Sequence, residues 1–217
     1  MFSYLSQYSI TWIDAIGTSR RYPPTEGWAH LVEQWIASID EPVYGVGHSL
    51  GGYLNYLAAV RRPELFHAIV LLDAPIIGPF RGRMLGATKR LGIAAHFRTR
   101  KLFENFAPQC LADYVEHGLV EKEGGLRLKI DPLIEYQIYR TIPHDMMRHL
   151  KSLRVPAAFI GGAESDVVRR VRLAGMKTRF LMRKVPGGHL FPFEQPRQAA
   201  RSIARVLEEL AASPRSS

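Results

Sequence analysis

Apolar residues follow two alternating patterns along the chain, that of short buried strands and that of one-sided helices. The strand-like runs are residues 8–14, 42–47, 67–73, 155–162 and 178–185. The helix-like segments are residues 25–39, a segment from 50 that stops near Pro63, a segment from about Val167, and residues 195–210. The run Ala68–Leu72 contains no polar residue, which is typical of a parallel strand covered on both faces.

The alternation pauses between about Gly78 and Leu153, in a stretch that is basic, rich in aromatic residues and helical in character. The pattern therefore predicts an α/β protein with a mostly parallel sheet and an inserted helical cap. We expect residues 1–77 and 153–217 to form the core and residues 78–152 to form the cap.

Composition adds limits to this picture. A chain of 217 residues that is 47% hydrophobic and 23% charged is long enough for one sizeable domain. No apolar run reaches the ~18 residues of a membrane span, and the first residues lack the features of a secretion signal. The single cysteine, Cys110, cannot form an internal disulfide, so we expect a cytoplasmic protein.

The formal net charge of +9 raises the question of an anionic partner. No zinc-finger, RNP or basic-zipper pattern accompanies the basic residues, so we expect no nucleic-acid partner. No cysteine and histidine spacing suggests a metal, and no glycine-rich phosphate loop suggests a cofactor. Most of the charge is expected to lie on a solvated face, with an anion-attracting rim around a site as the alternative.

The segment GVGHSLGG, residues 45–52, connects a strand-like run to an apolar helix. It contains the pattern G-x-S-x-G, which places a serine on a sharp strand-to-helix turn. Glycines are expected beside Ser49 because Cβ atoms there would collide with the strand and the helix. The turn would expose the hydroxyl at a helix N-terminus, where developing negative charge is favoured. Ser49 is therefore a candidate nucleophile, and a structural serine in the turn is the alternative.

A nucleophilic serine needs a base, and the base needs an orienting carboxylate. His189 follows the last predicted strand in a glycine-rich loop that could carry an imidazole over the sheet edge. His48 is expected to pack within the turn. Asp166 follows the strand before last and is the predicted acid, with Glu164 and Asp73 as alternatives.

Several segments resemble the α/β-hydrolase superfamily, and within it the compact bacterial hydrolases with a helical cap. The matching segments are GHSLGG, RRPELFHAIVLLD, VPAAFIGGAESD and GGHLFPFEQP, in the family's order and spacing. The resemblance covers nearly the whole chain, the insertion being its least specific part. It implies Ser49 as nucleophile, Asp166 as acid, His189 as base and the backbone N–H of Leu50 as an oxyanion donor.

The sequence departs from the family pattern at its N-terminus. Nothing matches the strand and following loop that supply the second oxyanion donor in the family. We therefore expect a fold that is N-terminally incomplete, with Met1 an internal position of a longer protein. The alternative is a short protein that has lost or moved this loop. Losing one oxyanion donor costs roughly 10²–10³ in rate, so the activity of the chain is an open question.

The expected reaction is transfer of an acyl group to water without a metal or cofactor. The insertion's phenylalanines, tyrosines and methionines favour a small or medium hydrophobic ester as substrate. Arg81, Arg83 and Lys89 leave open a thioester with an anionic carrier. The sequence also leaves open a C–C bond hydrolase on the same triad and a non-catalytic remnant, because a fold does not fix the chemistry.

Overall fold

In the computed structural model, the described part of the chain comprises residues 1–12, 28–76, 103–122, 124–129, 138, 141–143, 145–170 and 173–212. Its centre is a parallel sheet with the strand order β1-β2-β5-β6. The strands are β1 (Val43–His48), β2 (Phe66–Leu72), β5 (Ala157–Gly162) and β6 (Leu181–Val185). Strands two to five of the sequence prediction are thus confirmed, with ends shifted by at most three residues.

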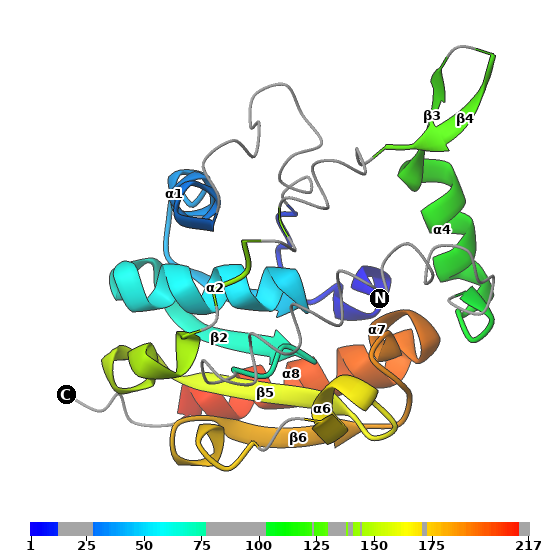
Figure 1. The fold of residues 1–217 in the computed structure, drawn as a ribbon. Coiled ribbons are helices and arrows are strands. Elements are labelled where there is room, and N and C mark those ends of the chain that lie inside the picture. The colour runs from blue at the N-terminus through cyan, green and yellow to red at the C-terminus, as the bar shows by residue number, and fades with distance from the viewer. Residues whose placement is uncertain are drawn as a thin grey trace.

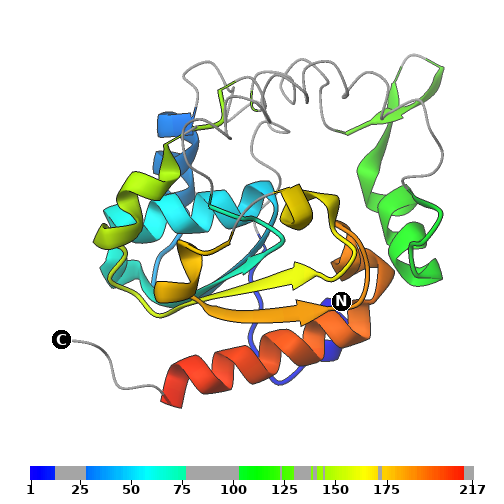
Figure 2. The same cartoon turned by 60° about the horizontal axis from the view of Figure 1, so that its bottom comes forward.

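Helices cover both faces of this sheet (Figures 1 and 2). On one face lie α1 (Trp28–Ala37), α2 (Leu50–Arg61) and the 3-10 helix η4 (Met146–Ser152). On the other lie α8 (Pro196–Ala212) and the N-terminal 3-10 helix η1 (Phe2–Leu5). The chain therefore has the predicted mostly parallel α/β architecture.

Strand β2 shows why the sheet is buried on both sides. Its residues alternate between the two hydrophobic clusters: Ile69 and Leu71 pack toward α2, whereas Ala68, Val70 and Leu72 pack toward α8. All five side chains are essentially inaccessible to solvent. An uninterrupted apolar run is required because every pleat of a central parallel strand faces a helix.

The predicted first strand differs from the structure. Residues 8–12 contain no strand, and residues 13 and 14 lie outside the described residues. The imperfect alternation of this run is a weak strand signal that tertiary context overrides. Strand β1 consequently forms one edge of the sheet within the described ranges.

The described part of the insertion contains strands as well as helices. After helix α4 (Pro108–Gly118), strands β3 (Leu119–Lys122) and β4 (Gly125–Leu128) form an antiparallel hairpin. The polar patch EKEGG overlaps the ends of both strands, and Gly124, just before β4, adopts a φ of +80°. Both views show α4 and the hairpin standing away from the sheet (Figures 1 and 2). The predicted cap boundaries remain a prediction.

The remaining elements join the layers. The short 3-10 helices η2 (Pro63–Leu65) and η5 (Met176–Thr178) precede β2 and β6, and the short helices α6 (Asp166–Arg170) and α7 (Phe191–Glu194) follow β5 and β6. No helix in the described part of the chain is both long and apolar enough to cross a membrane.

Candidate active site

Ser49 lies at the carboxyl end of β1, in the turn that leads directly into α2. Its φ of 50° and ψ of −112° are a strained conformation for a residue with a Cβ atom. The turn is anchored because the Ser49 N–H donates to the Leu72 carbonyl at 2.9 Å, as if the strand pairing continued. This geometry projects the hydroxyl from the rim of the sheet.

The glycines around Ser49 are not equally constrained. A Cβ atom on Gly47 would lie 2.4 Å from the Gly51 backbone, and one on Gly52 would lie 2.6 Å from the Ala74 Cβ. A Cβ atom on Gly51 would meet nothing within 4 Å. A side chain at Gly51 would therefore not clash, and the expectation is wrong for this glycine of the G-x-S-x-G pattern. Gly52 is the position where α2 packs closely against Ala74, in the segment that follows β2.

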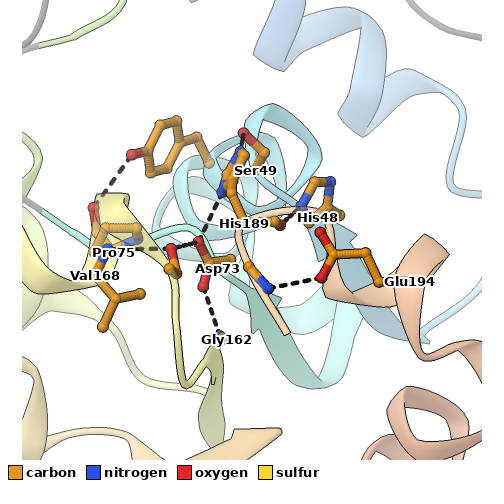
Figure 3. Close-up of polar contacts among 11 residues, drawn as sticks. His48, Ser49, Asp73, Pro75, Gly162, Val168, His189 and Glu194 are labelled. Atoms are coloured by element: carbon orange, nitrogen blue, oxygen red, sulfur yellow. Dashed lines mark hydrogen bonds and ion pairs between the residues drawn. The ribbon is translucent and has the colours of Figure 1, made fainter. Parts of the chain in front are cut away.

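His189 reaches Ser49 from the loop after β6. Its Nε2 lies 3.2 Å from Ser49 Oγ, and its Nδ1 lies 2.7 Å from Asp73 Oδ2 (Figure 3). Since the carboxylate accepts only, Nδ1 carries the proton and donates it to Asp73, which leaves Nε2 free to accept from the serine hydroxyl. The structure thus brings Ser49 and His189 together, as the sequence predicts.

The partner of His189 corrects the sequence-based choice of acid. Asp166 is exposed at the start of α6, where its carboxylate pairs with Arg169, so the prediction that it lies beside His189 is wrong. The alternative Glu164 is also elsewhere, because its carboxylate accepts from the Gly187 N–H. Asp73, which follows β2 in the middle of the sheet, occupies the position instead.

Asp73 is held as a buried carboxylate by three donors. Its Oδ1 accepts from the Gly162 N–H at 2.8 Å, and its Oδ2 accepts from the Ser165 hydroxyl at 2.6 Å as well as from His189. Its side chain is fully inaccessible to solvent, whereas that of His189 is 30% exposed. A buried carboxylate needs such donors because it would otherwise be unsolvated.

Ser165 explains why Asp166 points away. The Ser165 oxygen also accepts from the Val168 N–H at 3.3 Å, so this serine is the N-cap of α6. Capping turns residue 165 toward the buried side and residue 166 toward solvent. The preference of serine for N-cap positions is a sequence signal that could have identified this turn.

His48 lies between the serine turn and the His189 loop. Its Nε2 donates to the main-chain carbonyl of His189 at 2.8 Å, and the two rings lie 4.9 Å apart. Burial, with a smaller contribution from His189, lowers the pKa of His48 to about 4. His48 is therefore neutral near pH 7, and it packs within the turn as the sequence predicts.

An aromatic contact joins the insertion to this region. Phe106 stacks on Phe193 with ring centroids 5.1 Å apart, and the Ala107 N–H donates to the Phe193 carbonyl at 2.9 Å. Phe193 in turn meets the His48 ring edge-on. The basic residues Arg81, Arg83 and Lys89 of the insertion lie outside the described residues.

Leu50, the predicted oxyanion donor, is the first residue of α2. The first N–H groups of a helix have no acceptor within the helix, so they can bind an anion or a developing oxyanion. Leu50 N–H therefore lies where the prediction requires a donor, and its role stays a prediction.

Comparison with known proteins shows the family to which this fold belongs. Residues 2–202 match the model of the alpha/beta hydrolase family. The chain belongs to this family. An abhydrolase domain-containing protein of Alternaria alternata is 25% identical over 225 residues, covering 79% of this chain and 85% of that protein.

Two solved structures share the fold of this alpha/beta hydrolase at low identity. The thioesterase domain from the curacin biosynthetic pathway has a TM-score of 0.63 and 18% identity, over 83% of this chain and 74% of that one. The E-2-(acetamidomethylene)succinate hydrolase has a TM-score of 0.63 and 21% identity, over 83% of this chain and 70% of that one.

Proposed function

We propose that this alpha/beta hydrolase cleaves a carboxylic ester with Ser49 as nucleophile, His189 as base and Asp73 as orienting acid. The observation that carries the proposal is the hydrogen-bonded series from Ser49 Oγ through the imidazole to a buried carboxylate, with contacts of 3.2 and 2.7 Å. Nucleophile, base and orienting group are each within reach of the next, as covalent acyl transfer requires.

Each group has a defined part in the reaction. Ser49 Oγ attacks the ester carbonyl while His189 Nε2 takes its proton and then gives it to the departing alcohol. Water attacks the acyl-serine by the same route and releases the acid. Asp73 keeps the imidazole in the tautomer with its proton on Nδ1 and stabilises the cation that forms, a role that suits its three donors.

The tetrahedral oxyanion needs donors placed before the reaction begins. The Leu50 N–H is the donor we assign, because it follows Ser49 at the beginning of α2. A helix of twelve residues starting at this point adds a favourable field for the developing negative charge.

A small or medium hydrophobic ester is the substrate class that we favour. Phe103, Phe106 and Tyr114 of the insertion form a partly buried aromatic cluster, with Phe103 contacting both of the others. This cluster continues through Phe193 to His48, the residue beside the nucleophile. An apolar surface close to the reacting groups suits an acyl or alcohol group without charge.

The test is a panel of p-nitrophenyl esters together with a fluorophosphonate probe, applied to the wild type and to Ser49→Ala. We expect ester turnover and covalent labelling by the wild type, with a loss of about 10⁴–10⁶ in kcat for the variant. Equal turnover by both proteins would contradict the nucleophile assignment.

The same panel distinguishes the remaining hydrolytic reactions. Turnover of an acyl-CoA or a diketone without ester turnover would replace the ester by a thioester or a C–C bond on the same triad. Absence of both turnover and labelling in the wild type would favour a non-catalytic remnant.

A further inference from the structure

The loop that carries His189 is rich in glycine, and hydrogen bonds to neighbouring residues fix its shape. It follows β6 as Pro186-Gly187-Gly188, and Gly187 adopts a φ of +113° that side chains rarely allow. Consecutive glycines give a backbone many accessible conformations. The His189 ring is hydrogen-bonded to Ser49 and Asp73 and packs on His48, contacts that act on the side chain and leave the backbone to be held by other groups.

Glu164 binds the loop at Gly187, through its carboxylate and its own N–H. Two further side chains bind the backbone closer to the His189 Cα, one on either side of it. The His48 Nε2–H donates to the His189 carbonyl at 2.8 Å, and the Glu194 Oε2 accepts from the Gly188 N–H at 2.7 Å (Figure 3). His48 belongs to β1 and neighbours the nucleophile, whereas Glu194 ends α7. The loop is therefore tied both to the serine turn and to the helix that follows it.

The surroundings keep both side chains in place. Phe193 packs edge-on against the His48 ring with centroids 5.9 Å apart, and its own ring stacks on Phe106. The space above Gly187 is filled by Glu194, since a Cβ atom on that glycine would lie 2.6 Å from Glu194 Oε2. At Gly187 the loop therefore packs directly against Glu194.

We propose that His48 and Glu194 are positioning residues that clamp the backbone of the His189 loop, so that the imidazole stays between Ser49 and Asp73. This proposal rests on the proposed function for its kinetic consequence. The clamp itself is a property of the loop that can be measured without turnover.

The rate should depend on this clamp because proton transfer requires hydrogen-bond distance and alignment. A displacement of about 1 Å at a reacting group can cost about 100-fold in rate. The His48 Nε2–H and the Glu194 carboxylate are both engaged with the loop backbone, so loss of either bond should lower kcat more than it changes KM.

The experiment uses a disabling and a conservative variant at each position. His48→Leu removes the donor, while His48→Gln keeps an amide N–H near the place of Nε2. Glu194→Met removes the acceptor, while Glu194→Gln keeps a carbonyl oxygen. Thermal melts show which variants fold, and the two glutamine variants keep the test informative where a disabling variant does not.

Three measurements are made on each variant: kcat and KM for p-nitrophenyl butyrate, hydrogen–deuterium exchange of residues 186–195, and the low-field NMR signal of the His189 Nδ1 proton. We expect the disabling variants to lose about 10- to 100-fold in kcat, to exchange faster in the loop and to weaken the signal. The glutamine variants should recover most of the kcat and the slow exchange.

The proposal is overturned if folded His48→Leu and Glu194→Met retain kcat, loop exchange and the proton signal of the wild type. It is equally overturned if the glutamine variants behave like the disabling ones. If the wild type shows no turnover or labelling, the proposed function fails, while loop exchange and the proton signal still decide on the clamp.

Discussion

Ser49 and Asp73 stand side by side at the carboxyl ends of two paired strands, and each has a φ of 50°. His48 and Leu72, the residues just before them, are partners in the register of β1 and β2. The Ser49 N–H donates to the Leu72 carbonyl of β2 at 2.9 Å, and the Asp73 N–H donates to the Ile160 carbonyl of β5 at 2.8 Å. Strain at both positions turns two side chains toward the same imidazole, which is consistent with a functional site.

Replacing Asp73 by asparagine should abolish most activity. An asparagine removes the charge and favours the wrong tautomer of His189, so we expect kcat to fall by about 10⁴. Asp166→Asn serves as the matched control, since it removes a carboxylate from an exposed ion pair with Arg169, and it should keep the wild-type kcat. Ester kinetics of both variants check this, and the reverse ranking would restore Asp166 as the acid.

Ser165→Ala should weaken both the acid and the helix that follows it. It removes a hydrogen bond to the Asp73 carboxylate and the N-cap of α6. We expect the free energy of unfolding to fall by about 1–3 kcal/mol and kcat to fall with it. Urea unfolding and ester kinetics measure the two effects, and unchanged stability would contradict the inferred role of this serine.

Replacing Gly51 or Gly52 by alanine should change the stability of the protein in opposite directions. The Cβ of Gly52→Ala would lie 2.6 Å from Ala74 Cβ and 2.9 Å from the Gly47 carbonyl oxygen, so repacking should cost about 1–3 kcal/mol. The Cβ of Gly51→Ala would have no neighbouring atom within 4 Å, and alanine is favoured over glycine in a helix. The free energy of unfolding of this variant should therefore rise by up to about 1 kcal/mol. Urea unfolding of the pair tests this, with equal destabilisation as the contrary result.

Acid should destabilise the wild type more than His48→Gln. Burial lowers the His48 pKa from 6.5 to about 4, so between these values the unfolded chain binds a proton that the folded chain does not. The contribution of neutral, buried His48 to the free energy of unfolding is therefore complete above pH 6.5, and it is lost progressively as the pH falls to about 4. A difference of 6.5 − 4 = 2.5 in pKa corresponds to about 3 kcal/mol.

The measurement is the free energy of unfolding of both proteins at pH 7 and pH 4. The wild type should lose about 3 kcal/mol more than the variant, because glutamine cannot take up a proton in the unfolded chain. Parallel pH profiles for the two proteins would show that His48 titrates normally in the folded protein.

The sequence by itself determined the elements that local patterns specify. The apolar run of β2, the stripe of α8 and the glycine-bounded serine are encoded within a few residues each, so strands, helices and the serine turn were predictable. His189 could be placed near Ser49 because it follows the last strand in a glycine-rich loop, and the structure has its Nε2 3.2 Å from the Ser49 hydroxyl.

Only the tertiary structure decided which carboxylate hydrogen-bonds to the imidazole and at which glycines a Cβ atom would clash. All parallel strands end at the same rim, so Asp73, Glu164 and Asp166 were equivalent by position in the chain. The choice depends on side-chain direction, which the Ser165 cap and the strained φ of Asp73 set through contacts between distant segments. Such contacts leave no periodic trace in a sequence, and the close approach of Gly52 to Ala74 is hidden for the same reason.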